Sequence, residues 1–234
     1  MRFYLLILFF IANFSVYAQE VMMDVKMEKD TVYSKKGPNM KKFSHLYMGF
    51  GFAASGVDGD SLTINYGKSN DFIFGLRHKI KVNNFYSFGA DLFYSFRNTN
   101  IAQTNDKKFA TGLNHRKERY SEKNVGAIIY NRFNFGKRGN KIGKFIDLGA
   151  YAEVPINNAL ITTDRISTPN FDQIKVVRKS LNFYNPYNYG ISFRAGINQT
   201  VLFANYRLSN QFKSKFNFAE LPRLTAGFQI GLHQ

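Results

Sequence analysis

The sequence predicts an all-β fold, an eight-stranded antiparallel up-and-down transmembrane β-barrel. Segments of the chain alternate with a period of two, so that large apolar side chains fall on one face of an extended strand and glycine or charged side chains on the other. The connections between these segments alternate between long and short. Strands cross a bilayer only as a closed barrel, because every backbone N–H and C=O must be paired within the protein.

The chain begins with the pattern of a signal peptide. Arg2 is followed by an apolar run over residues 3–14, and small residues precede a cleavage site after Ala18. We therefore expect a signal peptide at 1–18. Residues 19–43 are polar, mixed in charge and without a sustained period, which predicts a flexible periplasmic leader. The barrel is expected at 44–234.

Composition narrows the class of protein. The 234 residues include 25 Phe and 14 Tyr but no Cys, so disulfides, metal–thiolate sites and a lipid-anchored cysteine are excluded. Mean hydropathy is -0.29, and after the N-terminus no run approaches the roughly 18 apolar residues of a spanning helix. The formal charge of +16 is spread over leader, turns, loops and strands of an exported chain, so we expect no nucleic-acid partner.

The first hairpin, residues 71–97, shows the pattern most clearly. Its apolar face includes Phe72, Phe74 and Leu76, while Arg77 lies on the opposite face. A three-residue loop at 83–85 sets Leu76 opposite Leu92, Phe74 opposite Tyr94, and Arg77 opposite Asp91. Register and polarity then agree on both faces of the hairpin.

The remaining strands follow the same alternation. They are expected at residues 44–55, 123–135, 145–154, 187–197, 200–208 and 222–232. Pro155 ends the strand before it, because proline cannot donate to a ladder, and the two-residue turn at 198–199 pairs Phe193 with Ala204.

The lengths of the connections favour an outer-membrane barrel over a soluble one. Long connections are expected at 56–70, 98–122, 155–186 and 209–221, with shorter ones at 83–85, 136–144 and 198–199. Outer-membrane barrels place short turns at the periplasm and long loops outside. A lipocalin-like barrel is the alternative, and its faces would be reversed, apolar inside and polar outside.

Inward-facing charges predict a closed polar lumen. We expect ion pairs between Arg77 and Asp91 and between Arg132 and Asp147, which would fill an eight-stranded interior too narrow for an open channel. A small-solute or ion pore is the alternative for these charges.

The predicted loop 98–122 carries five basic residues, Lys107, Lys108, Arg116, Lys117 and Arg119. Outside the cell they would meet lipid A phosphates of lipopolysaccharide, or an envelope protein partner, by point-charge attraction. A solvated surface explains the same residues. The apolar outer face of the barrel would contact outer-membrane lipid.

No catalytic, cofactor or metal site is expected, and the protein is predicted not to be an enzyme. The alternative is a lipid acyl hydrolase built on serine, histidine and an acid. Its histidine would be His78, which falls on the lipid face and meets Ser87 and Ser95 only across the wall. The other histidines, His45, His115 and His233, lie at strand ends or in a loop, so spacing assembles no triad.

Two strands carry a resemblance to a known family. The strand 125–136 reads VGAIIYNRFNFG and the last strand, 224–232, reads LTAGFQIGL. With the signal peptide and polar leader, this chain resembles the PorT-like outer-membrane β-barrel domain family of Bacteroidota-type bacteria. It departs from that family at Gly126, near which relatives often carry proline. The resemblance implies a non-enzymatic outer-membrane barrel with a structural or interaction role, such as an accessory subunit of a secretion or gliding machine.

Overall fold

The computed structural model describes residues 37–54, 62–104, 107, 109–136, 139–168 and 171–233. The expected signal peptide and most of the expected leader lie outside the described residues. All statements below concern the compact unit 35–234.

The described chain forms nine strands and two short 3-10 helices. The strands are β1 (Lys42–Ala53), β2 (Asn70–Lys81), β3 (Tyr86–Ile101), β4 (Lys117–Phe135), β5 (Lys144–Thr168), β6 (Phe171–Lys179), β7 (Asn188–Ile197), β8 (Thr200–Arg207) and β9 (Leu224–Leu232). The helices are η1 (Tyr66–Lys68) and η2 (Ser214–Phe216). Among the described residues, no helix has the length and apolar character needed to cross a membrane.

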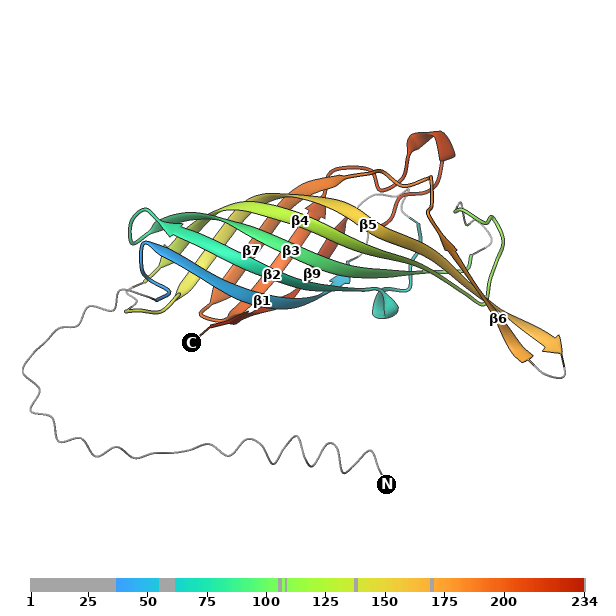
Figure 1. Cartoon of the computed structure of the whole chain (residues 1–234), viewed down its shortest axis with the longest axis horizontal. Coiled ribbons are helices and arrows are strands. Elements are labelled where there is room, and N and C mark those ends of the chain that lie inside the picture. The colour runs from blue at the N-terminus through green and yellow to red at the C-terminus, as the bar shows by residue number, and fades with distance from the viewer. Residues whose placement is uncertain are drawn as a thin grey trace, which may run out of the picture. The chain divides into compact units, whose positions relative to one another are not determined.

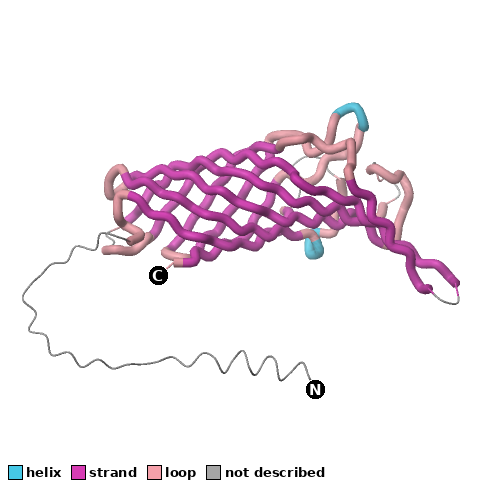
Figure 2. The backbone as a smooth tube through the Cα atoms, viewed as in Figure 1, coloured by secondary structure: helices cyan, strands magenta, loops and turns pink. Residues whose placement is uncertain are grey.

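All nine strands belong to one antiparallel sheet, and eight of them close into a ring. Around the ring the order is β1, β2, β3, β4, β5, β7, β8, β9 and back to β1, while β6 pairs with β5 outside the ring (Figure 1). The all-β barrel that the sequence predicts is confirmed. We call the end with the short turns the turn end and the opposite end the loop end; both are visible in Figure 2.

The predicted registers are confirmed in both hairpins. In β2–β3, Leu76 lies opposite Leu92 and Arg77 opposite Asp91, and in β7–β8 Phe193 lies opposite Ala204. The β2–β3 turn is fixed by Asn83, whose side-chain oxygen accepts hydrogen bonds from the backbone N–H groups of Phe85 at 2.9 Å and Tyr86 at 2.7 Å. Asparagine is favoured at such positions because its side chain substitutes for a backbone acceptor.

The prediction that Pro155 ends its strand is wrong. β5 continues through Pro155 to Thr168, and the β4–β5 register shifts where Asn124 pairs with Pro155 but Lys123 pairs with Asn157. The extra residue, Ile156, makes a bulge, a position at which a strand accommodates proline without losing its ladder. The expected loop 155–186 therefore consists largely of the outer half of β5 and of β6.

The loop expected at 98–122 is also shorter than predicted. β3 continues to Ile101 and β4 begins at Lys117, so the connection spans 102–116. Glu118, Tyr120 and Glu122 are buried on the interior side of β4, and the residues between them face outward. This strand segment looks hydrophilic in the sequence because its interior positions are polar.

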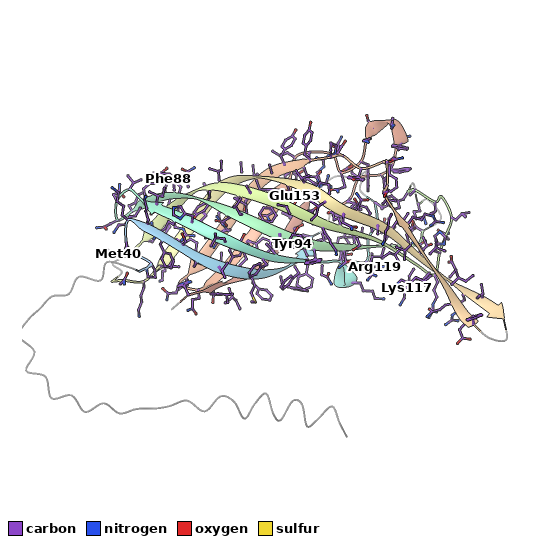
Figure 3. All side chains as sticks on the ribbon, viewed as in Figure 1. Met40, Phe88, Tyr94, Lys117, Arg119 and Glu153 are labelled. Atoms are coloured by element: carbon purple, nitrogen blue, oxygen red, sulfur yellow. The ribbon has the colours of Figure 1, made fainter. Side chains whose placement is uncertain are left out.

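In the ring, most of the buried polar positions are charged or hydrogen-bonding side chains that point inward, while the outer wall is mainly apolar. Figure 3 labels Phe88 and Tyr94 of the outer wall and Glu153 of the interior. Arg77 and Arg132 are each 1% exposed and Asp91 is 0% exposed, whereas Leu92 is 64% and Ile129 71% exposed. This is the reverse of a lipocalin-like barrel, in which apolar side chains fill the interior.

Interior glycines let aromatic rings lie flat across neighbouring strands. A Cβ atom on Gly126 would stand 2.5 Å from the Phe93 ring, and one on Gly75 would stand 2.7 Å from the Tyr47 ring. In both cases the aromatic residue is the cross-strand neighbour of the glycine. The same pairing recurs at Gly89 with Tyr130, Gly190 with Tyr151, and Gly196 with Phe145.

Candidate functional site

Five buried side chains near the turn end form an alternating chain of charges, Arg77, Asp91, Arg194, Asp147 and Arg132, which we call the arginine–aspartate chain. Arg77 Nε lies 3.0 Å from Asp91 Oδ2, and Arg132 Nε lies 2.7 Å from Asp147 Oδ1, so both expected ion pairs are present. Arg194 joins them, with its Nη1 on Asp91 and its Nε 3.1 Å from Asp147. Each side chain is at most 1% exposed.

Arg194 is the link that sequence reasoning missed. It lies on β7, directly opposite Asp147 of β5, and its bond to Asp91 of β3 crosses the interior. The alternating pattern of β7 does predict that Arg194 points inward. Its partner could not be predicted, because a long segment separates β5 from β7 and the sequence does not indicate the register between them. Three guanidinium groups face two carboxylates here. The rings of Tyr47 and Tyr130 lie 4.4 Å from the Arg77 and Arg194 guanidinium carbons, and such faces stabilise a desolvated cation.

A second charged layer lies nearer the loop end and has the opposite balance. Arg97 donates to three carboxylates: Asp71 at 3.1 Å, Glu122 at 2.9 Å and Glu153 at 3.0 Å. Gln211, from the connection before β9, donates to Glu122 at 2.8 Å. The Arg97 layer therefore joins β2, β3, β4 and β5 to a loop that folds inward.

Between the two charged layers, aromatic and aliphatic side chains fill the barrel. This interior layer consists of Tyr47, Ile73, Phe93, Ile128, Tyr130, Tyr151 and Phe203. The cavity that Asp71, Arg97 and Glu122 help to line measures about 30 Å³, room for only one or two water molecules. Buried side chains therefore occupy the interior between the two charged layers.

The loop end is covered by an apolar cluster that we call the loop cap. Its buried members are Leu62, Ile64, Ile101, Phe109, Tyr120, Leu160, Leu181, Phe212 and Leu221. Ring centroids of Phe109 and Phe212 lie 5.4 Å apart, and those of Phe183 and Phe218 lie 5.3 Å apart. Four connections supply six of these residues, and Ile101, Tyr120 and Leu160 come from β3, β4 and β5. The loops therefore fold onto the end of the barrel.

At the turn end, the last residues of the expected leader are part of the packed structure. β1 begins at Lys42, two residues before the expected barrel boundary. The buried Lys79 ammonium donates to the carbonyl oxygen of Pro38, and Lys81 Nζ lies 3.1 Å from the side-chain oxygen of Asn39. The prediction that the leader is flexible as far as residue 43 is therefore wrong for its end.

The five basic residues expected to form one exposed loop are not together. Lys107 is buried, with its ammonium 2.6 Å from Glu118, and Lys108 lies outside the described residues. Lys117 and Arg119 belong to β4, as Figure 3 shows, while Arg116 ends the preceding connection. The prediction that these five residues form one exposed loop cluster is therefore wrong.

A different basic surface lies where β4, β5 and β6 run side by side beyond the ring, a region we call the ribbon. Cross-strand pairing aligns Lys117 with Thr163 and Lys175, and Arg119 with Ile161 and Val177. Five cations share this side, which we call the basic face: Lys117, Arg119, Arg165, Lys175 and Lys179. None of the described carboxylates lies on that side of the three strands.

The histidine of the hydrolase alternative has a partner that sequence reasoning did not consider. Ser44 and His78 are opposite each other on β1 and β2, with Ser44 Oγ 2.7 Å from His78 Nδ1. This pair is exposed on the outer wall near the turn end. Ser87 and Ser95 are buried in the interior, so neither meets His78. Among the described residues, no carboxylate hydrogen-bonds to His78.

Comparison with protein-family models finds none that matches this chain, and a search of curated proteins finds no match. The resemblance to the PorT-like barrel family therefore stays a prediction. Within the described ranges, no group of three or more histidine, cysteine or acidic side chains is placed to hold a metal ion.

Proposed function

We propose that this protein is an integral outer-membrane barrel with a closed lumen and a structural or interaction role. The reversed distribution of its side chains carries the proposal. Soluble monomers rarely expose contiguous apolar patches beyond a few hundred Å². Here the outer wall exposes apolar side chains around the ring, including Phe74, Leu92, Ile129, Leu148, Phe193 and Phe228.

Aromatic side chains at the turn end support a membrane boundary there. Phe85 lies 5.7 Å from Phe133 and 6.1 Å from Phe135 between ring centroids, and Tyr86 lies 5.8 Å from Phe133. The Tyr86 hydroxyl donates to Asn131 at 2.6 Å. Rings with an apolar body and a polar tip gather where lipid meets water.

Because the proposed lumen is closed, we expect the barrel to act through its outer surface. Among the described segments, the ribbon extends beyond the loop end into the proposed extracellular space (Figure 1). The basic face continues the outer wall just beyond the proposed apolar belt, a position at which Lys and Arg attract phosphates of outer-leaflet lipid A. Together with the PorT-like resemblance, this supports an accessory role in an envelope assembly.

Two leucines with nearly the same exposure test membrane insertion. Leu92 is 64% exposed on the barrel wall and Leu113 is 67% exposed in a loop. A charge on the lipid face at mid-bilayer costs about 2–4 kcal/mol, whereas a charge in a solvated loop costs little. We expect Leu92→Arg to lower the fraction that folds into liposomes, measured by heat-dependent gel mobility, while Leu113→Arg folds normally. Equal folding of the two variants, or a soluble periplasmic wild-type protein, contradicts the proposal.

One observation favours a second function, a lipid acyl hydrolase. The Ser44–His78 hydrogen bond places a nucleophile and a base together on the wall that lipid would contact. Release of labelled fatty acid by the wild-type protein, lost in both Ser44→Ala and His78→Ala, would establish this activity. Absence of release supports the interaction role.

A further inference from the structure

The ribbon ends in an open sheet edge. β6 pairs with β5 from Lys179 opposite Ala159 to Phe171 opposite Thr168, and it is the last strand in the sheet order. In the part of the chain that the structure describes, β5 is the only strand that pairs with β6, and all residues of β6 are exposed. Figure 1 shows the β5–β6 hairpin extending past the loop end. An edge of this kind offers a row of backbone donors and acceptors to another strand.

Apolar side chains lie on both sides of this edge strand. Ile174 and Val176 share one side with Asp164 and Thr162 of β5, a side that we call the inner face because it continues the barrel interior. Val177 lies on the basic face. These three side chains are 47%, 39% and 45% exposed. A strand added beside β6 would cover them, and cross-strand contacts of this type stabilise sheets.

At the barrel end of β6, the inner face leads into a groove of about 470 Å³. Apolar side chains such as Leu160 and Phe183 make up most of its lining, and its polar residues are Arg178, Thr111 and His115. His115 is hydrogen-bonded to Asp164. The volume falls in the range of sites that hold a small ligand or a large side chain. A mostly apolar lining with Arg178 as its one guanidinium group fits an aromatic or aliphatic side chain with a carboxylate next to it.

Charge selects among the possible occupants. β6 carries Lys175, Arg178 and Lys179 against one carboxylate, Asp172. A second copy of the chain would bring another strand of the same net positive charge to the edge, whereas an acidic segment would complement it. Lipid phosphates would meet the cations but would use neither the backbone edge nor the groove.

We propose that β6 accepts an extended acidic segment of another polypeptide as an added strand, with an apolar or aromatic side chain in the groove and a carboxylate against Arg178. Main-chain pairing would provide affinity and the groove would provide specificity. The inference rests on the proposed function, because membrane insertion leaves the ribbon outside the bilayer.

The test uses the full barrel refolded into liposomes of zwitterionic lipid and a fluorescent ten-residue peptide. The peptide alternates glutamate with valine, and phenylalanine replaces one glutamate. Two N-methylated versions of the peptide are compared. Each carries N-methyl groups on every second backbone amide, so one version blocks one edge of the added strand and the other version blocks the opposite edge. Only one edge of an added strand pairs with β6, so we expect one N-methylated version to lose binding and the other to retain it. Equal binding of the two versions overturns strand addition.

Two charge reversals on the same strand test the groove. Arg178→Glu should weaken peptide binding by roughly tenfold or more. The matched control Lys175→Glu makes the same change in net charge on the opposite side of β6 and should weaken binding clearly less, because it leaves the groove intact. Loss with Lys175→Glu alone would overturn the groove assignment. Binding of lipid A vesicles without any peptide binding, or dimerisation through β6, would also overturn the proposal. Heat-dependent gel mobility of the same samples separates failure of this inference from failure of membrane insertion.

Discussion

Asp91 holds the arginine–aspartate chain together, because it accepts hydrogen bonds from arginines of two different strands. Replacing it with alanine leaves Arg77 and Arg194 without that carboxylate in a confined space. Breaking a buried ion pair in this way costs about 3–5 kcal/mol. We expect Asp91→Ala to lower the free energy of unfolding, measured by denaturant titration in lipid. Addition of Arg77→Met should recover part of the loss, and further addition of Arg194→Met should recover more. Strictly additive losses would show that the chain is not coupled.

Asp164 gives a pH-dependent contact outside the proposed bilayer crossing, at the base of the ribbon. His115 Nδ1 lies 2.8 Å from Asp164 Oδ2, and this hydrogen bond lowers the pKa of the Asp164 carboxyl below its ordinary value. A carboxyl group whose pKa is lower in the folded protein than in the unfolded chain stabilises the folded protein. This stabilisation is fully present at pH values above the pKa of the unfolded chain, which is about 4. The contribution disappears as the pH falls through the lower, folded pKa.

We therefore expect the carbon NMR titration of the Asp164 carboxyl to have a midpoint below about 4 in the wild-type protein. In His115→Ala the midpoint should rise toward the ordinary value. The same midpoint in both proteins would show that the contact does not form in solution.

At the scale of the elements, each strand that forms the ring could be predicted from its sequence, because the two environments of the wall demand a strict period of two. β6 could not be predicted in this way. Both of its sides are exposed, so nothing enforces an alternation of polar and apolar residues. The bulge at Pro155 hid the continuity of β5, since proline at a strand position normally indicates an end.

The elements also give a topology that can be checked on cells. The β3–β4 connection contains Gly112, exposed and with a φ of +61°, at the loop end, whereas exposed Gly139 lies in the β4–β5 turn at the other end. We expect a tag inserted at Gly112 to be labelled by a membrane-impermeant reagent on intact cells. A tag at Gly139 should be labelled only after the outer membrane is opened. The opposite result would invert the proposed topology.

At the scale of the whole molecule, the interior was less predictable than the wall. Arg77 with Asp91 and Arg132 with Asp147 could be paired because each pair lies within a hairpin. Arg194 could not be assigned a partner from local spacing, since contacts across a barrel depend on its closure. The loop cap was missed because its phenylalanines are scattered over several connections and show no period.

Closure of the interior predicts that the barrel does not conduct solutes. An ion or solute would have to break the bond between Asp91 and Arg194, which crosses the lumen. It would also have to displace the aromatic layer and pass the loop cap. We expect planar-bilayer recordings of the refolded wild-type protein to show no sustained current of porin size, with an open porin as the control in the same bilayers. A stable large conductance would reject the closed lumen and make a small-solute or ion pore the better account of the buried charges.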